Sequence, residues 1–177
     1  MLGTGSRYEN PRTGGSLEVL EMTPQVLRFK RLYKPRTGRA DPHLHLDFVH
    51  SWEVIAGRAR FELDGEEREL GPGEAAKIEL NRPHRDLFNP YEDEALARFE
   101  IRPCNEFVET FFETLVWLFE RGRLDEQENF HQLQLFVILH ATKAQSFVAG
   151  PPIALQKGLL PVLAAIGRLR GYRPRYG

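Results

Sequence analysis

The sequence predicts a mainly β protein, with an antiparallel barrel over residues 16–103 and helices over residues 104–172, in a single domain of residues 1–177. Short β-like runs broken by turn residues fill the first part, which is typical of an all-β barrel or sandwich. After Cys104 the apolar residues recur at helical spacing instead. A chain of 177 residues is long enough to bury one core without a disulfide.

The barrel strands are separated by recognisable turns. Asp64-Gly65 accepts the positive φ of a type I′ turn and predicts a hairpin between the runs on either side. Gly71-Pro72-Gly73 and Asn89-Pro90 mark two later connections. Connections this short join antiparallel neighbours. The expected strands are Leu17–Leu20, Val26–Tyr33, His43–Phe48, Trp52–Ile55, Ala59–Leu63, Glu66–Leu70, Ala75–Leu80, Arg85–Phe88 and Ala95–Ile101.

Three helices are expected after the barrel. Asn105 can cap the first, whose apolar side carries Phe107, Phe111, Leu115, Leu118 and Phe119, and Gly122 ends it. The second covers roughly residues 128–143. The third covers roughly residues 153–169, is entered through Pro151-Pro152, and is expected to be kinked or divided at Pro161. Their apolar surface predicts packing on the barrel or across a dimer interface.

Composition limits the partners. The chain has 24 Lys and Arg against 25 Asp and Glu, so it lacks the charge of a dedicated nucleic-acid binder and favours a small-molecule ligand. Its longest apolar runs fall short of the roughly 20 residues that span a bilayer, and we expect no membrane partner. The polar N-terminus and the single Cys104 favour the cytoplasm. A basic tail, expected to be solvated, contains Arg168, Arg170, Arg173 and Arg175.

Four histidines in the β region are candidate metal ligands. His43 and His45 are two residues apart, so on one strand both imidazoles project from the same face. His50 lies an odd step further on, and a bend near residues 47–49 has to return it to that face. His84 follows Pro83 in a later hairpin. A lone strand histidine is more often a core or surface residue, and spacing by itself leaves both interpretations open.

The order of these residues resembles the two conserved motifs of the cupin superfamily. His43-Leu44-His45, His50 and Gly57 resemble the first motif, and Gly73 with Pro83-His84 resembles the second. The layout, a barrel followed by a helical tail, looks like that of small bacterial single-domain cupins of the cupin_2 type. The resemblance implies a double-stranded β-helix, or jelly-roll barrel, and a homodimer. It also implies one divalent transition metal bound by His43, His45, His50 and His84.

Several positions depart from the family pattern. The first motif normally has Glu where His50 stands, so this chain would offer four neutral imidazoles and no carboxylate. The second usually has Pro and Gly where Glu79 and Asn81 stand, and Asn tolerates the left-handed conformation well enough to keep the turn. Asn89 and Gly38 are each displaced by one residue, which predicts only local adjustment.

An all-histidine site favours Fe, Zn, Ni, Cu or Mn over Mg or Ca. Without a carboxylate it would keep the full +2 charge and favour substrates with an acidic oxygen. An octahedral ion would leave two positions open for chemistry, whereas tetrahedral zinc would be closed by four histidines and structural. The sequence does not decide between these alternatives.

Strand alternation predicts what surrounds the ion. The expected pocket residues are Trp52, Val54, Phe61, Ile78 and Phe88. Asp86 shares the face of His84 and is the candidate general base or hydrogen-bond partner of a ligand; an exposed position at the barrel rim is the alternative. Glu53 would replace His50 as ligand only if the register slipped by one residue.

The sequence therefore predicts a metal-binding cupin. The favoured function is a metal-dependent enzyme, an oxygenase, cyclase or isomerase, acting on a small, partly apolar molecule with an enolisable or phenolic oxygen. The alternatives are a non-catalytic module that binds or senses a small ligand, and a barrel with a structural metal.

Overall fold

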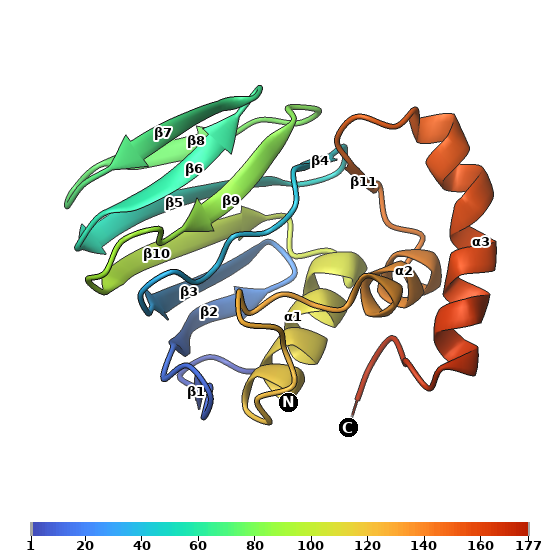
Figure 1. Ribbon diagram of the computed structural model, residues 1–177, viewed down its shortest axis with the longest axis horizontal. Coiled ribbons are helices and arrows are strands. Elements are labelled where there is room, and N and C mark those ends of the chain that lie inside the picture. Colours follow the sequence, from blue (N-terminus) through green and yellow to red (C-terminus); the bar gives the residue numbers. More distant parts are fainter. Residues whose placement is uncertain (1, 177) are drawn as a thin grey trace.

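Two antiparallel sheets face each other in the computed structural model, which describes residues 2–176 (Figure 1). The six-stranded sheet has the order β1-β2-β3-β10-β5-β8 and the five-stranded sheet the order β11-β4-β9-β6-β7. The strands of the first are β1 (Arg7–Glu9), β2 (Ser16–Thr23), β3 (Val26–Tyr33), β10 (Ala95–Arg102), β5 (Val49–Ala56) and β8 (Ala75–Ile78). Those of the second are β11 (Ser146–Val148), β4 (His43–His45), β9 (His84–Phe88), β6 (Ala59–Leu63) and β7 (Glu66–Leu70).

The predicted fold class, mainly β with a C-terminal helical part, is confirmed. The β6–β7 hairpin turns at Asp64 and Gly65 with φ values of 54° and 86°, as the type I′ turn requires. Asn81 adopts the left-handed conformation, with φ of 59°, so Asn does replace the usual glycine of that turn. The strands missed from sequence are β1 and β11, each only three residues long.

The core lies between the sheets and is largely aromatic. Phe99 on β10 is paired in register with Phe29 on β3 and with Trp52 on β5. The Phe29 and Phe99 rings stack with centroids 4.8 Å apart, and Trp52 reaches across to Phe61 of the other sheet at 5.6 Å. Alternate residues of these strands therefore point inward, as the pattern of the sequence predicts.

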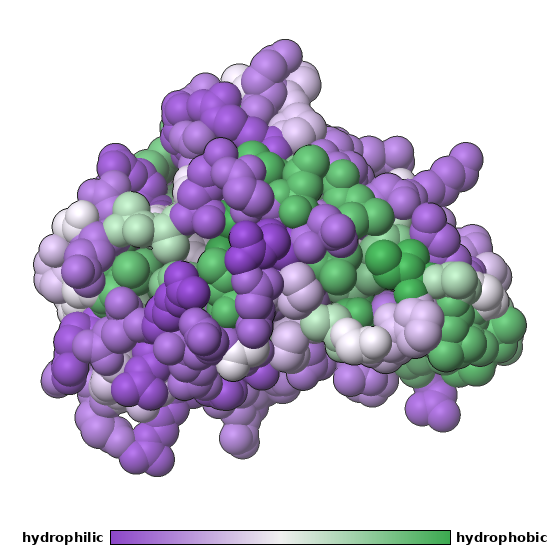
Figure 2. All heavy atoms as spheres, turned by 90° about the horizontal axis from the view of Figure 1, so that it is seen from above, coloured by the Kyte–Doolittle hydropathy of each residue, from purple (hydrophilic) through white to green (hydrophobic). Residues whose placement is uncertain are grey.

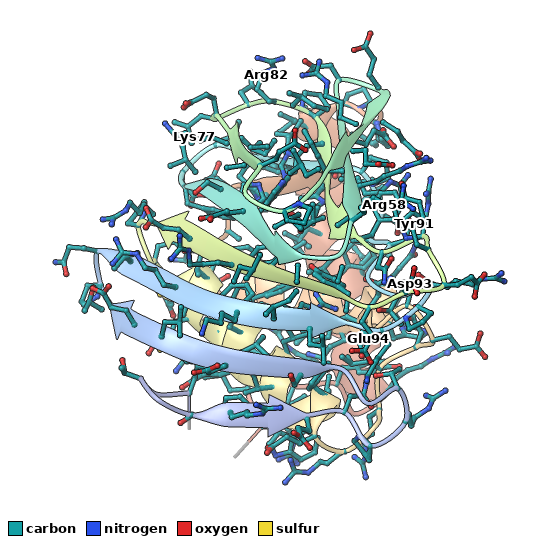
Figure 3. All side chains as sticks on the ribbon, turned by 90° about the vertical axis from the view of Figure 1, so that its left-hand side faces the viewer. Arg58, Lys77, Arg82, Tyr91, Asp93 and Glu94 are labelled. Atoms are coloured by element: carbon teal, nitrogen blue, oxygen red, sulfur yellow. The ribbon has the colours of Figure 1, made fainter. Side chains whose placement is uncertain are left out.

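The connections at one end of the sheets are held by an aromatic and cationic cluster. The Arg58 guanidinium lies 4.4 Å from the centroid of the Tyr91 ring, and the two residues lie side by side in Figure 3. Arg60 Nε donates to the Tyr91 hydroxyl at 3.0 Å. Next to them, a Cβ on Gly57 would lie 2.2 Å from the Glu94 carbonyl oxygen, so only glycine fits this turn.

The helices α1 (Glu106–Phe119), α2 (Gln132–Ala141) and α3 (Ile153–Leu169) lie on one side of the sheets, with α3 outermost and packed on α2 (Figure 1). Asn105 caps α1, since its Oδ1 accepts from Val108 N at 3.0 Å as predicted. The predicted start of the second helix near residue 128 is wrong. Glu128 has φ of 61°, and its buried carboxylate accepts from Arg31 at 2.9 Å in the loop before α2.

α3 has the predicted bounds, and it continues through Pro161 as one helix. It packs closely on α2, because a Cβ on Gly167 would lie 2.6 Å from the Val137 side chain. Among the helices of residues 2–176, none is long and apolar enough to cross a bilayer.

Candidate metal centre

The four predicted histidines come together between the two sheets. His43 and His45 on β4 and His84 on β9 belong to the five-stranded sheet, and His43 is paired with His84 in register. His50 comes from β5 of the facing sheet. The chain bends at residues 46–47 as it crosses from one sheet to the other. This is the bend that the sequence predicts near residues 47–49, and it turns the His50 side chain inward. Neighbouring ring centroids are 4.5 to 5.4 Å apart.

The closest approach is between two ring nitrogens. His50 Nε2 lies 2.9 Å from His84 Nε2. Two nitrogens bound at right angles to one ion at about 2.1 Å would be about 3.0 Å apart, so this separation fits adjacent ligands. A hydrogen bond between the two rings would have the same length. The contacts of the other ring nitrogen, Nδ1, show whether Nε2 carries a hydrogen or presents a lone pair.

Oxygen atoms orient three of the rings. His43 Nδ1 lies 2.8 Å from the Asp41 carbonyl oxygen and His84 Nδ1 lies 2.7 Å from the Arg82 carbonyl oxygen. A carbonyl can only accept, so each Nδ1 carries the hydrogen and each Nε2 presents a lone pair to the cluster. His45 Nδ1 lies 2.8 Å from Ser146 Oγ on β11. This is the supporting arrangement that metal-binding histidines use.

Asp86 lies beside three of the four histidines. Its Oδ1 is 3.4 Å from His50 Nδ1 and 3.9 Å from His84 Nε2, and its Oδ2 is 3.6 Å from His43 Nε2. Oδ1 is buried and has no hydrogen-bond partner among residues 2–176. A buried carboxylate oxygen without a donor is costly, and a cation beside it would satisfy it.

This placement corrects one sequence prediction. The ligands were expected to include no carboxylate and to keep the full charge of a divalent ion, with Asp86 either beside them or at the exposed barrel rim. The structure brings Asp86 within 4 Å of three of the histidines, so one negative charge remains at the site.

Burial keeps the histidines in the form that binds metal. It lowers the pKa of His50 to about 3, and the Asp86 carboxylate only partly offsets this effect. Burial also lowers the pKa of His45 well below its usual value, and burial together with His43 lowers that of His84. Burial raises the pKa of Asp86, but the surrounding imidazoles outweigh it and hold that pKa below its usual range. At neutral pH these groups are three neutral imidazoles and a carboxylate, ready to ligate.

The candidate ligand atoms form two overlapping triads. Those of His43, His45 and His84 all lie within 4.8 Å of one another, as do those of His50, His84 and Asp86. His84 is common to both and is 1% exposed. The His43 and Asp86 side chains are 21% and 36% exposed, so solvent reaches the cluster from their side. Five nitrogen and oxygen donors in this arrangement fit a divalent transition metal.

The predicted pocket residues fall into two groups. Trp52, Val54, Phe61 and Ile78 are buried inside the barrel, at 4% exposure or less, and the Trp52 ring meets the His50 ring edge-on at 4.9 Å. The indole nitrogen of Trp52 is buried without a hydrogen-bond acceptor among the described residues. These side chains contact one another, and so form a packed floor beneath the histidines.

The prediction that Phe88 shares the face of His84 is wrong. β9 pairs with β6 through His84↔Leu63 and Arg85↔Glu62, but then through Phe88↔Arg60, so β9 has an extra residue there. A β-bulge of this kind reverses the alternation. Phe88 therefore shares the outer face with Arg60, where the Arg39 guanidinium lies 4.6 Å from its ring centroid.

The register alternative for Glu53 is excluded. Glu53 pairs with Arg98 in register on the outer side of the six-stranded sheet, and their side chains form a salt bridge. Sequence reasoning missed Ser146, which reaches His45 from the C-terminal part of the chain. The segment Ser146–Val148 is too short for an alternating pattern to reveal it as a strand.

Comparison with known proteins gives structural similarity only. No protein-family model matches the chain, and no curated protein matches it. The solved structures that match include proteins described as cupins or as containing a double-stranded β-helix domain. KdgF from Halomonas sp. is 21% identical, with a TM-score of 0.49, over 57% of this chain and 89% of that one. A cupin-superfamily sugar phosphate isomerase from Silicibacter pomeroyi is 16% identical, with a TM-score of 0.47, over 55% and 70% of the two chains.

A third match is an uncharacterized conserved protein with a double-stranded β-helix domain from Klebsiella pneumoniae. It is 20% identical, with a TM-score of 0.46, over 54% of this chain and 84% of that one. Similarity at this level concerns the fold, and the activities named are those of the other proteins.

Proposed function

We propose that this chain binds one divalent transition metal at His43, His45, His50 and His84, with Asp86 beside the ligands as a base, and that it is a metal-dependent enzyme. The observation that carries the proposal is the shared orientation of the imidazoles. Backbone carbonyls hold Nδ1 of His43 and His84, which leaves each Nε2 free to bind an ion. The buried, unpartnered Asp86 Oδ1 supports a cation at the same place.

A bound divalent ion would supply a positive centre that favours an ionised substrate oxygen, such as an enolate or phenolate. Asp86 is the group placed to move a proton. Its carboxylate is ionised at neutral pH, borders three of the histidines, and is partly exposed on the solvent side. A substrate arriving from solvent therefore meets a base beside the ligands.

This arrangement favours reactions that begin with proton abstraction. Among the three reaction classes predicted from sequence, isomerase and cyclase fit a carboxylate base best, and the oxygenase does not require one. The substrate is a small, partly apolar molecule with an enolisable or phenolic oxygen.

A non-catalytic ligand-binding role is the second candidate. It is favoured by the packing of Trp52, Val54, Phe61 and Ile78 beneath the histidines, which fills the barrel interior. A small ion or acid could still reach the exposed side of His43 and Asp86. The expectations of a homodimer and of a cytoplasmic location stay predictions from the sequence.

The test combines metal content with proton exchange. Elemental analysis of the purified protein should give close to one transition metal per chain, and His84→Ala should abolish it. In D₂O, exchange of α-protons in small 2-oxo acids and 1,3-dicarbonyl compounds should require the metal. Asp86→Asn should retain the metal and lose exchange by about 10²- to 10⁴-fold, the usual contribution of a general base.

Asp93→Asn is the matched control, since Asp93 is an exposed carboxylate on the loop after β9. It should leave both the metal content and exchange unchanged. Loss of metal in Asp86→Asn would identify Asp86 as a ligand and remove the base from the proposal. Metal binding without exchange of any of these compounds would favour the binding module, and absence of metal would overturn the site.

A further inference from the structure

The outward face of α3 is an exposed apolar stripe. Figure 1 shows α3 as the outermost element on its side of the molecule, and Figure 2 shows apolar surface gathered at that edge. The exposed large apolar residues of α3 recur at alternating steps of four and three, which places them along one side of the helix. They are Leu155, Leu159, Val162, Ile166 and Leu169, with 54%, 48%, 58%, 40% and 89% of their surface exposed.

The opposite side of the helix is the one that packs on the protein. Ala164 and Gly167 are buried, and Gly167 allows the close approach of α2. The apolar stripe therefore does not serve the fold of this chain. Five large apolar side chains in one row on a surface indicate an interaction site.

The charge of this part of the chain indicates the partner. The segment after Glu128 has no Asp or Glu, but six Lys and Arg: Lys143, Lys157, Arg168, Arg170, Arg173 and Arg175. Arg175 is used internally, in salt bridges with Glu109 and Glu113. None of the salt bridges within residues 2–176 uses Lys157, Arg168 or Arg170.

The contacts of these cations are with neutral groups, so their charge is not compensated: Lys157 Nζ lies 3.4 Å from Gln145 Oε1 and 5.4 Å from the centroid of the Phe147 ring, and Arg168 Nη2 lies 3.2 Å from His140 Nδ1. Lys157 and Arg168 are eleven residues apart, about three helical turns, so they lie on the same side of α3, where its exposed face meets the packed side. An α3 pair between two copies of the chain would double this uncompensated positive charge without adding a carboxylate from either helix. An anionic partner would neutralise them instead, which argues against a second copy at this face.

We propose that α3 lies flat on an anionic lipid surface, with its apolar stripe in the acyl boundary and Lys157, Arg168 and Arg170 at the phosphate level. A wide apolar face bordered by cations is the pattern of helices that lie in the plane of a membrane. The helix is about 25 Å long, and it does not span the bilayer. The inference replaces the sequence-based expectation of no membrane partner.

The experiment is flotation with vesicles of phosphatidylcholine alone and of phosphatidylcholine with phosphatidylglycerol. The full chain should float with the anionic vesicles and not with the neutral ones, and added salt should weaken binding. Leu159→Ser should weaken partitioning by about tenfold, because half of a leucine surface no longer enters the apolar region. Lys157→Gln should weaken it about fivefold, the effect of one cation near an anionic surface.

The chain contains matched controls for both substitutions. Leu80 on the turn between β8 and β9 is 47% exposed, against 48% for Leu159, so Leu80→Ser removes the same surface at a different site. Lys77 on β8 is also exposed, and Lys77→Gln removes the same charge. Both controls should bind anionic vesicles like the unsubstituted chain.

Two results would overturn the proposal. One is equal recovery of the chain with anionic and neutral vesicles, or equal losses in the α3 variants and their controls. The other is light scattering that shows a dimer dissociated by Leu159→Ser, together with no binding to vesicles, which would assign the stripe to a second copy.

Discussion

Ser146→Ala tests how the C-terminal part of the chain supports the metal centre. Ser146 is 8% exposed on β11, is paired in register with His45, and has its Oγ 2.8 Å from His45 Nδ1. The substitution removes the oxygen that orients this ring and leaves the ring itself in place. Loss of such a partner typically weakens metal affinity 10- to 100-fold. At about 1.4 kcal/mol for each factor of ten, the metal-bound protein should lose roughly 1.4 to 2.8 kcal/mol of binding free energy.

Two measurements separate this effect from simple destabilisation. Competition with a chelator measures the metal affinity directly. Denaturant unfolding, with metal and after its removal, measures stability in both forms. The metal-free protein should lose only about 1 kcal/mol, the net contribution of one hydrogen bond. The metal-bound protein should lose the binding term in addition, because a ligand bound only by the folded state stabilises it through its affinity.

Ser51→Ala is the control, since Ser51 lies on β5 next to His50 but on the alternate face of that strand. It should change neither the affinity nor the difference between the two unfolding curves. Unchanged metal affinity in Ser146→Ala would refute the reasoning that Ser146 orients His45. An equal loss of stability in both forms would show that Ser146 supports only the β4–β11 pairing.

Three further results are expected. Burial raises the pKa of the Cys104 thiol to about 11, so thiol reagents should modify it slowly in the native protein at pH 8, faster as the pH approaches 11, and at once after unfolding. Gly57→Ala should destabilise the fold by about 2 to 4 kcal/mol, because Gly57 has φ of 74° and its Cβ would meet the Glu94 carbonyl; a normal unfolding midpoint would refute this. Gly158→Ala, in open space on α3, should stabilise it by up to about 1 kcal/mol in the same assay.

Local patterns carried much of the fold prediction. The Asp64-Gly65 turn and the alternating runs around it gave β6 and β7 with their observed bounds, because turn chemistry and side-chain alternation are both local. The two-residue spacing of His43 and His45 placed both imidazoles on one face for the same reason. The convergence of His50 and His84 with them could be expected only from the resemblance to a family, since it depends on which strands face each other.

The remaining features depend on tertiary structure. The bulge that turns Phe88 outward is visible only in the pairing of β9 with β6, because the β9 sequence HRDLF has no alternating pattern that would locate it. The groups that orient His43 and His84 are backbone carbonyls, which any residue at those positions would supply. The buried ion pair of Glu128 with Arg31 joins residues 97 apart in the sequence. Glutamate suits a helix, but this contact holds Glu128 in a loop with φ of 61°.

The position of Asp86 changes what the substitution at His50 means. In the family pattern that the sequence resembles, a carboxylate stands at the position of His50, so its replacement by imidazole would remove the negative charge from the site. The structure retains a carboxylate beside the ring, 3.4 Å from His50 Nδ1 and on a different strand.

Asp86 can act in two ways. If a metal binds Nε2 of His50, the Nδ1–H of that ring faces Asp86, and the carboxylate contributes its negative charge to the site through the His50 ring. If a substrate instead donates a proton to Asp86, the same carboxylate acts as the base. The His50→Glu variant distinguishes the two roles: a glutamate ligand would repel Asp86 and raise its pKa. A loss of proton exchange at neutral pH that is recovered at higher pH, with the metal retained, would therefore identify Asp86 as the base.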